Sequence, residues 1–395
     1  MRSHTLLRGP SRHYQYQLSS LIKRQQTAPK LQRSRMSAAT SGKGSLPHQM
    51  RTAAEPRQNR LYNVRLSHIE QVNPCVRLLQ LTIPPEVQNP DDSSYQESDQ
   101  ESQPPPQPLT FLPGQWLDVH IPSISNAGGF SITSTPADAQ VLPSLANQDS
   151  DAVQAIVNND ATGLPPLNPD GRPPYVELAV RAAPSNPASA WLWKPAEEIL
   201  GSELAIRVGG SFVWPPSGVR LGDVRNVVFI AGGVGINPLI SMLSHLNNDD
   251  EATTTLRHPS LNIRFLYSTK LPQPDKATTP TTNPEKRLDQ ILFLSRLREI
   301  VNIQSQLRRL RIALDLFITD LDDDTRGVSF DDLRIHGRRI NADDLRAAAI
   351  SEDGTIEPEK TVCYVCGPPG MTDDIVGKLE GLLGGGERVF YEKWW

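Results

Sequence analysis

The hydrophobic residues in the second half of the chain fall into short runs, a pattern typical of parallel strands that are buried on both faces. The clearest run, residues 227–231, leads into a glycine cluster, and apolar residues at helical spacing follow it over residues 239–246. Similar runs come later in the chain, at residues 263–267, 312–316 and 361–366. The pattern predicts strands that alternate with helices, as in an α/β domain.

The first half of the chain shows a different pattern, in which strand-like stretches are separated by polar, proline-rich sequence. We expect strands at residues 76–83, 116–121, 175–181 and 204–212, and in the second of these apolar and polar positions alternate. Residues 86–108 and 137–172 lack the apolar residues needed to build a core, so we expect both to be disordered insertions.

Length and charge narrow the functional class. A chain of 395 residues is long enough for about two domains, and its formal net charge of −4 argues against nucleic acid as the main partner. No apolar run approaches the roughly 20 residues that span a bilayer, so we expect no transmembrane segment. The 3 cysteines are too few for a disulfide framework, which favours a reducing compartment.

The amino-terminal segment is basic and serine-rich, and its first acidic residue is Glu55. This composition is typical of a mitochondrial transit peptide, and there is no apolar core of the kind that a secretory signal needs. A solvated basic tail is the alternative interpretation. We assign residues 1–60 to a transit peptide and disordered tail, and expect a mitochondrial location.

The stretch from Val227 to Ser241 joins a strand, a glycine turn and a helix. Such a unit directs a helix amino terminus at an anion over the turn. Its sequence, Ala-Gly-Gly-Val-Gly-Ile-Asn-Pro-Leu-Ile-Ser, resembles the A-G-G-x-G-I-x-P-x-x-S signature of the ferredoxin–NADP reductase superfamily. An ordinary glycine turn is the alternative. The resemblance implies binding of a nicotinamide dinucleotide through Gly232, Gly233, Val234, Gly235, Ile236 and Pro238.

A second stretch, residues 128–134, resembles the R-x-Y-S-x-x-S flavin motif of the same superfamily. The resemblance implies that Phe130 packs on the isoalloxazine of FAD and that Ser131 lies near the flavin N5. Gly128 stands where the family has an arginine that pairs with the pyrophosphate, and glycine cannot replace that cation. The other cofactor contacts implied are Ile132, Thr133, Arg181 as a substitute phosphate partner, and Ser189, which could also simply cap a helix.

A third stretch, Thr361–Met371, has a β-branched strand that leads into a Gly-Pro-Pro-Gly turn. Cys363 and Cys366 would lie about 10 Å apart along a strand, too far for a disulfide, and no further Cys/His pair completes a metal site. We therefore place Cys363 in the core. Cys366 matches the family's C-G-P-x-x-M motif, which implies a catalytic contact with the nicotinamide ring and cofactor contacts by Gly367, Pro368 and Met371. A small core cysteine without a role is the alternative.

The chain ends in Glu-Lys-Trp-Trp, an unusual aromatic terminus. Plant-type reductases similarly place a carboxylate two residues before an aromatic that shields the flavin. This resemblance implies a catalytic role for Glu392 and a cofactor contact by Trp394, with aromatic packing at a domain interface as the alternative. At the end of the strand over residues 263–267, Ser268 and Lys270 are the expected ribose contacts. Lys270 could meet a 2′-phosphate or be a solvated surface charge, so NADH and NADPH both stay open.

Taken together, these motifs resemble the mitochondrial oxidoreductase-NAD-binding-domain-containing proteins. That resemblance implies an antiparallel flavin-binding barrel over residues 61–222, followed by a doubly wound, parallel-sheet NAD(P)-binding domain over residues 223–395. It also implies hydride transfer from NADH or NADPH to FAD, and then electron transfer to an acceptor that the sequence does not identify. The competing hypothesis is a non-catalytic NAD(P)-binding protein with a degenerate flavin site. The oligomeric state and the cleavage site of the transit peptide stay open.

Overall fold

The computed structural model describes residues 47–84, 108–140, 172–248, 261–272, 284–320, 333–351 and 354–394. Residues 1–46, which hold most of the predicted transit peptide, lie outside the described residues, as do most of the two predicted insertions. Within the described part, no helix combines the length and the apolar character needed to cross a bilayer.

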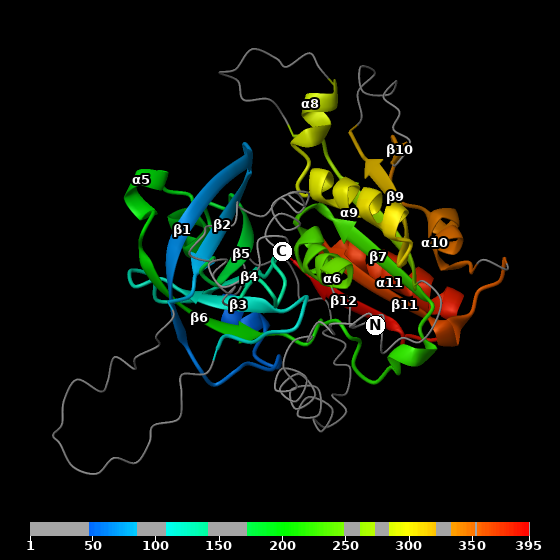
Figure 1. Cartoon of the computed structure of the whole chain (residues 1–395), viewed down its shortest axis with the longest axis horizontal. Helices are drawn as coiled ribbons and strands as arrows, with labels where there is room; N and C mark the ends of the chain where they lie inside the picture. The colour runs from blue at the N-terminus through cyan, green and yellow to red at the C-terminus, as the bar shows by residue number, and fades with distance from the viewer. Residues whose placement is uncertain are drawn as a thin grey trace, which may run out of the picture.

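The first domain is a six-stranded antiparallel sheet in the order β4-β3-β6-β1-β2-β5 (Figure 1). A bridge between Ile132, just after β4, and Leu178 of β5 brings the two edges together, so the sheet closes into the predicted barrel. The inward-facing side chains of β3, β5 and β6 are the apolar ones of each alternating strand, and they form one core. The elements of this domain are α2 (His48–Arg51), β1 (Tyr62–Asn73), β2 (Val76–Thr82), β3 (Trp116–His120), β4 (Gly128–Ser131), β5 (Tyr175–Arg181), α4 (Pro187–Leu192), α5 (Ala196–Ile199) and β6 (Glu203–Gly209).

The second domain is a six-stranded parallel sheet in the order β10-β9-β8-β7-β11-β12, as the uninterrupted apolar runs predict. Helices α6 and α9 pack on one face of the sheet, and α10 and α11 on the other. The elements are η4 (Leu221–Asp223), β7 (Asn226–Gly232), η5 (Gly233–Gly235), α6 (Ile236–Asn248), β8 (Leu261–Thr269), α8 (Pro284–Asp289), α9 (Leu294–Leu307), β9 (Leu310–Ile318), β10 (Arg334–His336), α10 (Ala342–Ala349), η6 (Pro358–Lys360), β11 (Thr361–Gly367), α11 (Pro369–Leu383) and β12 (Val389–Lys393).

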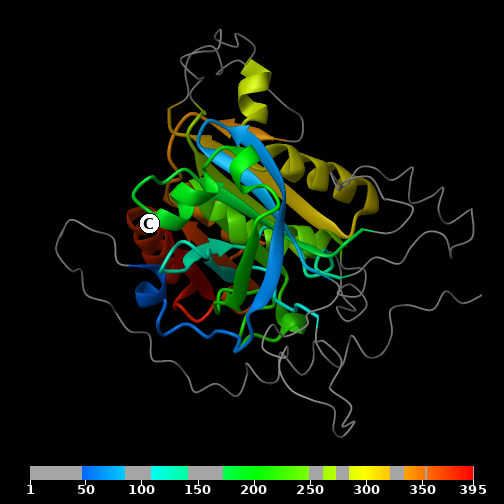
Figure 2. The same cartoon turned by 90° about the vertical axis from the view of Figure 1, so that its left-hand side faces the viewer.

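The two domains are joined by buried polar contacts that hold the barrel against α6 and α9. Arg296 of α9 makes a bidentate ion pair with the buried Glu177 of β5, at 3.0 and 3.1 Å. At the start of α6, Asn237 donates to the carbonyl of Ala179 in β5 at 2.9 Å. These contacts hold the amino end of α6, directly after the glycine turn, against β5 of the barrel. Figure 2 shows the barrel in front of the parallel-sheet domain.

The assignment of all of residues 1–60 to a disordered tail is wrong for residues 47–60, because this stretch packs on the barrel. Arg57 forms a β-bridge with Gly209, and the amide of Gln58 donates to the carbonyl of Val208 at 2.9 Å. The edges of the second insertion are also part of the fold, since Asp138 and Arg172 are buried and form an ion pair at 3.3 Å. Composition alone did not reveal these contacts, because a short polar segment becomes ordered only through the surface on which it lies.

Candidate functional site

The glycine turn lies at the carboxyl end of β7, the edge of a parallel sheet where ligands bind in α/β folds. Gly233 has φ +55°, and no atom lies within 4 Å of the place where its Cβ would be. Its positive φ favours glycine, while the open space leaves room for a ligand beside the backbone. The 13-residue helix α6 begins directly after the turn, so its amino terminus adds a partial positive charge at this point.

The glycine turn packs directly against the turn after β11. A Cβ on Gly232 would lie 2.5 Å from the sulfur of Met371, and one on Gly235 would lie 2.2 Å from the carbonyl oxygen of Cys366. The close approach of the turn after β7 to the turn after β11 therefore favours glycine at both positions. The two motifs, which are far apart in the sequence, form one surface at the carboxyl edge of the sheet.

Cys366, Glu392 and Trp394 meet at this edge. Cys366 and Glu392 are partners in the β11–β12 register, and the indole Nε1 of Trp394 donates to Glu392 Oε2 at 3.0 Å. The backbone amide of Trp394 donates to the carbonyl of Gly367 at 3.1 Å. The structure therefore brings Cys366, for which the resemblance implies a contact with the nicotinamide ring, together with Glu392 and Trp394, whose spacing resembles the carboxylate and the flavin-shielding aromatic of plant-type reductases.

The environment of this cluster keeps its acids protonated. Burial, reinforced by the nearby Glu392, raises the pKa of the Cys366 thiol well above its usual value, so the thiol is neutral. Burial also raises the pKa of Glu392 to about 8, although the hydrogen bond from Trp394 acts in the opposite direction. The cluster is thus close to electrically neutral near pH 7, which suits contact with a planar ring rather than nucleophilic chemistry.

Cys363 has no part in the site. It faces the α10–α11 side of the sheet, whereas Cys366 faces the α6 side, so the two thiols lie on opposite faces of β11. Burial raises the pKa of Cys363 to about 12. The prediction that Cys363 belongs to the core is confirmed.

In the barrel, Phe130 accounts for the glycine at position 128. A Cβ on Gly128 would lie 2.6 Å from Phe130 Cε2 and 2.6 Å from the Cβ of Ala188. The aromatic ring and helix α4 therefore fill the space beside Gly128, and an arginine side chain would not fit there. Ser131 is buried at the end of β4.

Several of the donors expected to hold the flavin are already engaged within the protein. The amide of Ile132 donates to the carbonyl of Gln115, and the amide of Thr133 donates to the carbonyl of Glu177, both at 2.9 Å. These two amides are therefore not free to donate to a flavin, because barrel closure uses both of them, and contacts of Ile132 and Thr133 with FAD through other atoms stay predictions.

The helix-capping role that was the alternative for Ser189 needs correction, whereas the phosphate contact expected of Arg181 stays a prediction. Asn186 caps α4 by accepting from the amides of Ala188 and Ser189, at 3.1 and 3.2 Å. The Ser189 hydroxyl is buried and donates to the carbonyl of Arg181 at 2.8 Å, so Ser189 does not cap the helix. The Arg181 side chain is exposed, and no described residue pairs with it. A sequence signal for the cap existed, since asparagine followed by proline is typical of a helix start.

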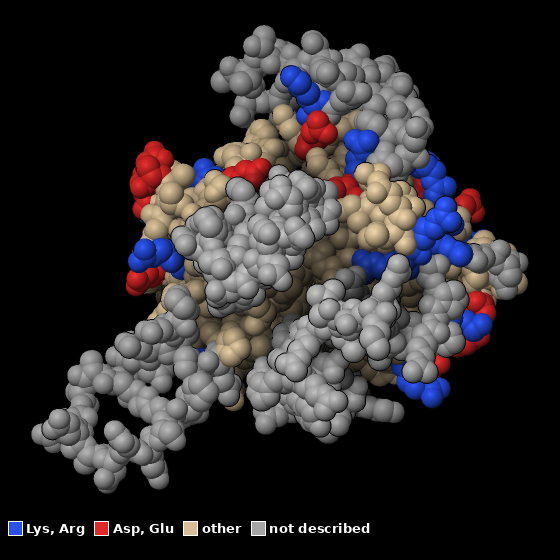
Figure 3. Space-filling view, in the orientation of Figure 1, with Lys and Arg blue, Asp and Glu red and all other residues tan. Residues whose placement is uncertain are grey.

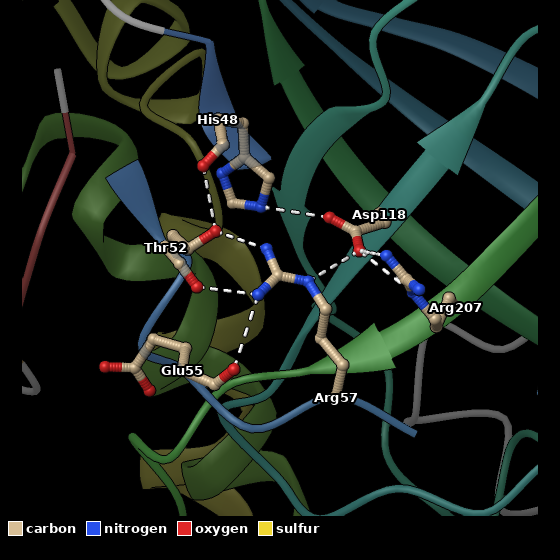
Figure 4. A network of polar contacts seen from close by, with 6 residues as sticks. All are labelled: His48, Thr52, Glu55, Arg57, Asp118 and Arg207. Carbon is tan, nitrogen blue, oxygen red and sulfur yellow. Dashed lines mark hydrogen bonds and ion pairs between the residues drawn. The ribbon is translucent and has the colours of Figure 1, made fainter. Parts of the chain in front are cut away.

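A group of polar and charged residues on the outer face of the barrel, centred on Asp118, was not predicted from the sequence (Figure 4). The carboxylate of Asp118 is fully buried. Its oxygens lie 2.9 Å from the guanidinium of Arg57, 2.8 Å from that of Arg207 and 3.4 Å from Nε2 of His48. Burial alone would raise the pKa of Asp118, but hydrogen bonds from these three side chains outweigh it and hold the pKa far below its usual value.

The ring of His48 links this charged group to the carboxyl terminus. It lies parallel to the ring of Trp394, with a centroid distance of 6.2 Å and an interplanar angle of 6°, and meets Trp116 edge-on at 4.6 Å. A Cβ on Gly129 would lie 2.1 Å from the His48 ring, so β4 contacts His48 closely. The sequence signal was weak, because Asp118 falls on the polar side of an alternating strand, where an exposed residue is the ordinary expectation.

At the neighbouring strand end, Ser268 is half-buried and Lys270 is exposed. Ser268 pairs in register with Gly232, which places it beside the glycine turn. Their contacts with the ribose stay predictions. Elsewhere in the described ranges, no group of three or more His, Cys, Asp and Glu side chains could hold a metal ion. On the visible face of the molecule, acidic and basic side chains are interspersed along the edges (Figure 3).

Comparison with solved structures supports this two-domain fold. The chain superimposes on the cytochrome P450 reductase GcoB of Amycolatopsis with a TM-score of 0.50 and 17% sequence identity, covering 86% of this chain and 70% of the other. At this identity the likeness concerns the fold alone.

Comparison of sequences identifies the family, although no family model matches the chain. The chain is 31% identical over 291 residues to oxidoreductase NAD-binding domain-containing protein 1 of Bos taurus, covering 73% of this chain and 72% of the relative. The protein of that name from Danio rerio is 28% identical over 348 residues, covering 88% and 97%. The chain therefore belongs to the oxidoreductase NAD-binding domain-containing protein 1 family.

Proposed function

We propose that this protein is a flavoprotein oxidoreductase that takes hydride from NADH or NADPH onto FAD and passes electrons to a further acceptor. The observation that carries the proposal is the meeting of Cys366, Glu392 and Trp394 beside the glycine turn. This arrangement forms a neutral ring site next to a backbone turn suited to a pyrophosphate. The family to which the chain belongs supports the same class of reaction.

The described residues fit a nicotinamide dinucleotide well. The open side of Gly233 and the amino end of α6 offer a position for the pyrophosphate, and the buried edge of β11 offers one for the ring. They fit FAD less completely. The space beside Gly128 is filled, and the α4 amides at its first turn are satisfied by Asn186.

The chain's own contribution is to bind the nicotinamide dinucleotide and the flavin, to orient their rings and to exclude water. We assign Cys366 to the contact with the nicotinamide ring, because its small neutral thiol lies at the strand end beside the turn. Glu392 orients the indole of Trp394 through their 3.0 Å hydrogen bond, and a protonated Glu392 keeps negative charge away from the ring. A flavin, when bound, supplies the two-electron acceptor.

A non-catalytic nucleotide-binding protein is the second candidate. The observation that favours it is the engagement of the expected flavin donors, above all the filled space at Gly128. A charged hydrogen bond to phosphate contributes about 1.5–3 kcal/mol, so loss of the arginine weakens FAD binding by about one to two orders of magnitude. Under the first proposal the protein purifies partly empty and regains colour with added FAD.

A flavin titration separates the two candidates. The visible spectrum of the full chain is recorded before and after FAD addition, and again after NADH or NADPH. Flavin bands that bleach with one of the two nucleotides are the expected result, and they would also identify the preferred coenzyme. Absence of flavin binding with FAD in excess, together with measurable NADH or NADPH binding by calorimetry, would favour the non-catalytic protein.

We also propose that the basic amino-terminal segment directs import into mitochondria. Because residues 47–57 pack on the barrel, cleavage is expected before Pro47. A reporter fused to residues 1–46 should enter mitochondria, and amino-terminal sequencing of the mature protein should find His48 retained. A fusion that stays diffuse in the cytosol would contradict the proposal.

A further inference from the structure

The segment from Pro47 to Arg57 crosses the outer face of the barrel and reaches the carboxyl terminus of the chain. It begins with the four-residue helix α2, which is far too short to be stable alone in water. Its position must therefore come from tertiary contacts. Those contacts lie at its two ends, at His48 and at Arg57.

The Arg57 end is an anchor. Its guanidinium donates to Asp118 at 2.9 Å and to the carbonyls of Thr52 and Glu55 at 2.6 and 3.3 Å (Figure 4). Glu55 in turn accepts from the amide and hydroxyl of Ser211, at 3.1 and 2.6 Å. One arginine thus ties the segment both to itself and to the barrel.

The His48 end is inserted between the domains. The side chain is only 5% exposed, although it lies on a terminal segment. Gly129 and Trp116 contact it from the barrel, Asp118 lies 3.4 Å from its Nε2, and Trp394 lies parallel to it from the second domain. A residue other than glycine at position 129 would collide with the ring, so the strand leaves space for His48.

On its other side, Trp394 belongs to the proposed ring site. Its indole nitrogen donates a hydrogen bond to the carboxylate of Glu392, and its backbone amide donates one to the carbonyl of Gly367. His48 therefore lies parallel to an aromatic residue that is hydrogen-bonded at the proposed ring site, without itself belonging to the strands that build that site.

We propose that residues 47–57 are a clasp, with His48 as the residue that positions Trp394 over the ring site. In this closed arrangement, a nicotinamide ring can reach the site only if Trp394 gives up its contact with His48. The clasp thereby lowers the affinity for NAD(P)H and keeps the site covered between turnovers. This inference rests on the proposed nucleotide site, and it concerns only the chain's own residues.

The contact itself is tested without any ligand. The full chain is labelled with 5-fluorotryptophan, and the resonance of Trp394 is assigned with Trp394→Phe. His48→Ala should shift that resonance, whereas His68→Ala, which removes an exposed histidine from β1, should not. Gly129→Ala provides an independent perturbation, because its methyl group would displace the His48 ring without removing it.

The effect on the nucleotide is measured by calorimetric titration of NADH and NADPH. Release of Trp394 should tighten binding by about twofold to tenfold, the range that an aromatic pair contributes. His48→Ala and Gly129→Ala should show this gain, and His48→Phe should restore the parental affinity because it retains an aromatic ring beside Trp394. In a Trp394→Ala background, His48→Ala should have no further effect.

An unchanged Trp394 resonance in both His48→Ala and Gly129→Ala would refute the contact. A shifted resonance with parental nucleotide affinity would refute the gating role. If the parent and Trp394→Ala bind neither nucleotide while the resonance still responds, the proposed function fails and the gating role fails with it, whereas the contact between His48 and Trp394 stands.

Discussion

Replacing Gly235 with alanine is expected to separate the two turns that form the nucleotide edge. The added Cβ would lie 2.2 Å from the carbonyl oxygen of Cys366 and 2.7 Å from the amide nitrogen of Gly367. Both are backbone atoms of a buried strand, so no flexible side chain can move aside. An ordinary contact begins near 3.4 Å, and the turns must therefore separate by about 1.2 Å.

Overpacking of this kind costs about 1–3 kcal/mol of folding free energy. The same displacement moves the glycine turn away from Cys366, so dinucleotide affinity should fall by at least tenfold. Urea unfolding measures the first effect, and calorimetric titration of NADH and NADPH measures the second.

Gly370→Ala is the matched control. Gly370 lies in the first turn of α11, is exposed, and has no atom within 4 Å of its Cβ position. Alanine at this position should leave stability unchanged or raise it by up to about 1 kcal/mol. Equal stability and equal dinucleotide affinity in Gly235→Ala and Gly370→Ala would refute the close packing of the two turns.

Three further outcomes are expected. The pKa of Glu392 is raised from 4.5 to about 8, so the folded state holds a proton that the unfolded state has lost in this range. The free energy of unfolding should therefore fall as pH rises from about 4.5 to 8, by at most about 5 kcal/mol. Urea titrations of Glu392→Gln should no longer show that pH dependence. Arg296→Met leaves the buried carboxylate of Glu177 unpaired and should cost about 3–5 kcal/mol, whereas Lys378→Met, which breaks an exposed pair, should cost less than about 1 kcal/mol; equal losses would contradict the inter-domain role. Cys366→Ala should slow stopped-flow flavin reduction while nucleotide affinity stays near the parental value, and reduction at parental speed would remove Cys366 from the ring site.

The sequence alone determined the second domain and the two turns at the carboxyl edge of its sheet. Buried parallel strands need continuous apolar runs, and a close turn needs glycine. The local sequence of residues 227–241 and 361–371 therefore predicts both the strands and the turns. The sequence did not predict that Cys366 lies beside Glu392, because this adjacency comes from the parallel register of β11 and β12.

Only the tertiary structure decided the barrel side of the site. Whether an amide or a hydroxyl is free depends on partners distant in sequence, as with Thr133 and Glu177 or Asn237 and Ala179. The place of His48 depends on Asp118 and Trp394, which lie 70 and 346 residues further along the chain. The polar segment of residues 47–57 carries no periodic pattern of its own. It becomes ordered only because Arg57 and His48 contact the buried carboxylate of Asp118 and because Gly129 leaves space for the His48 ring.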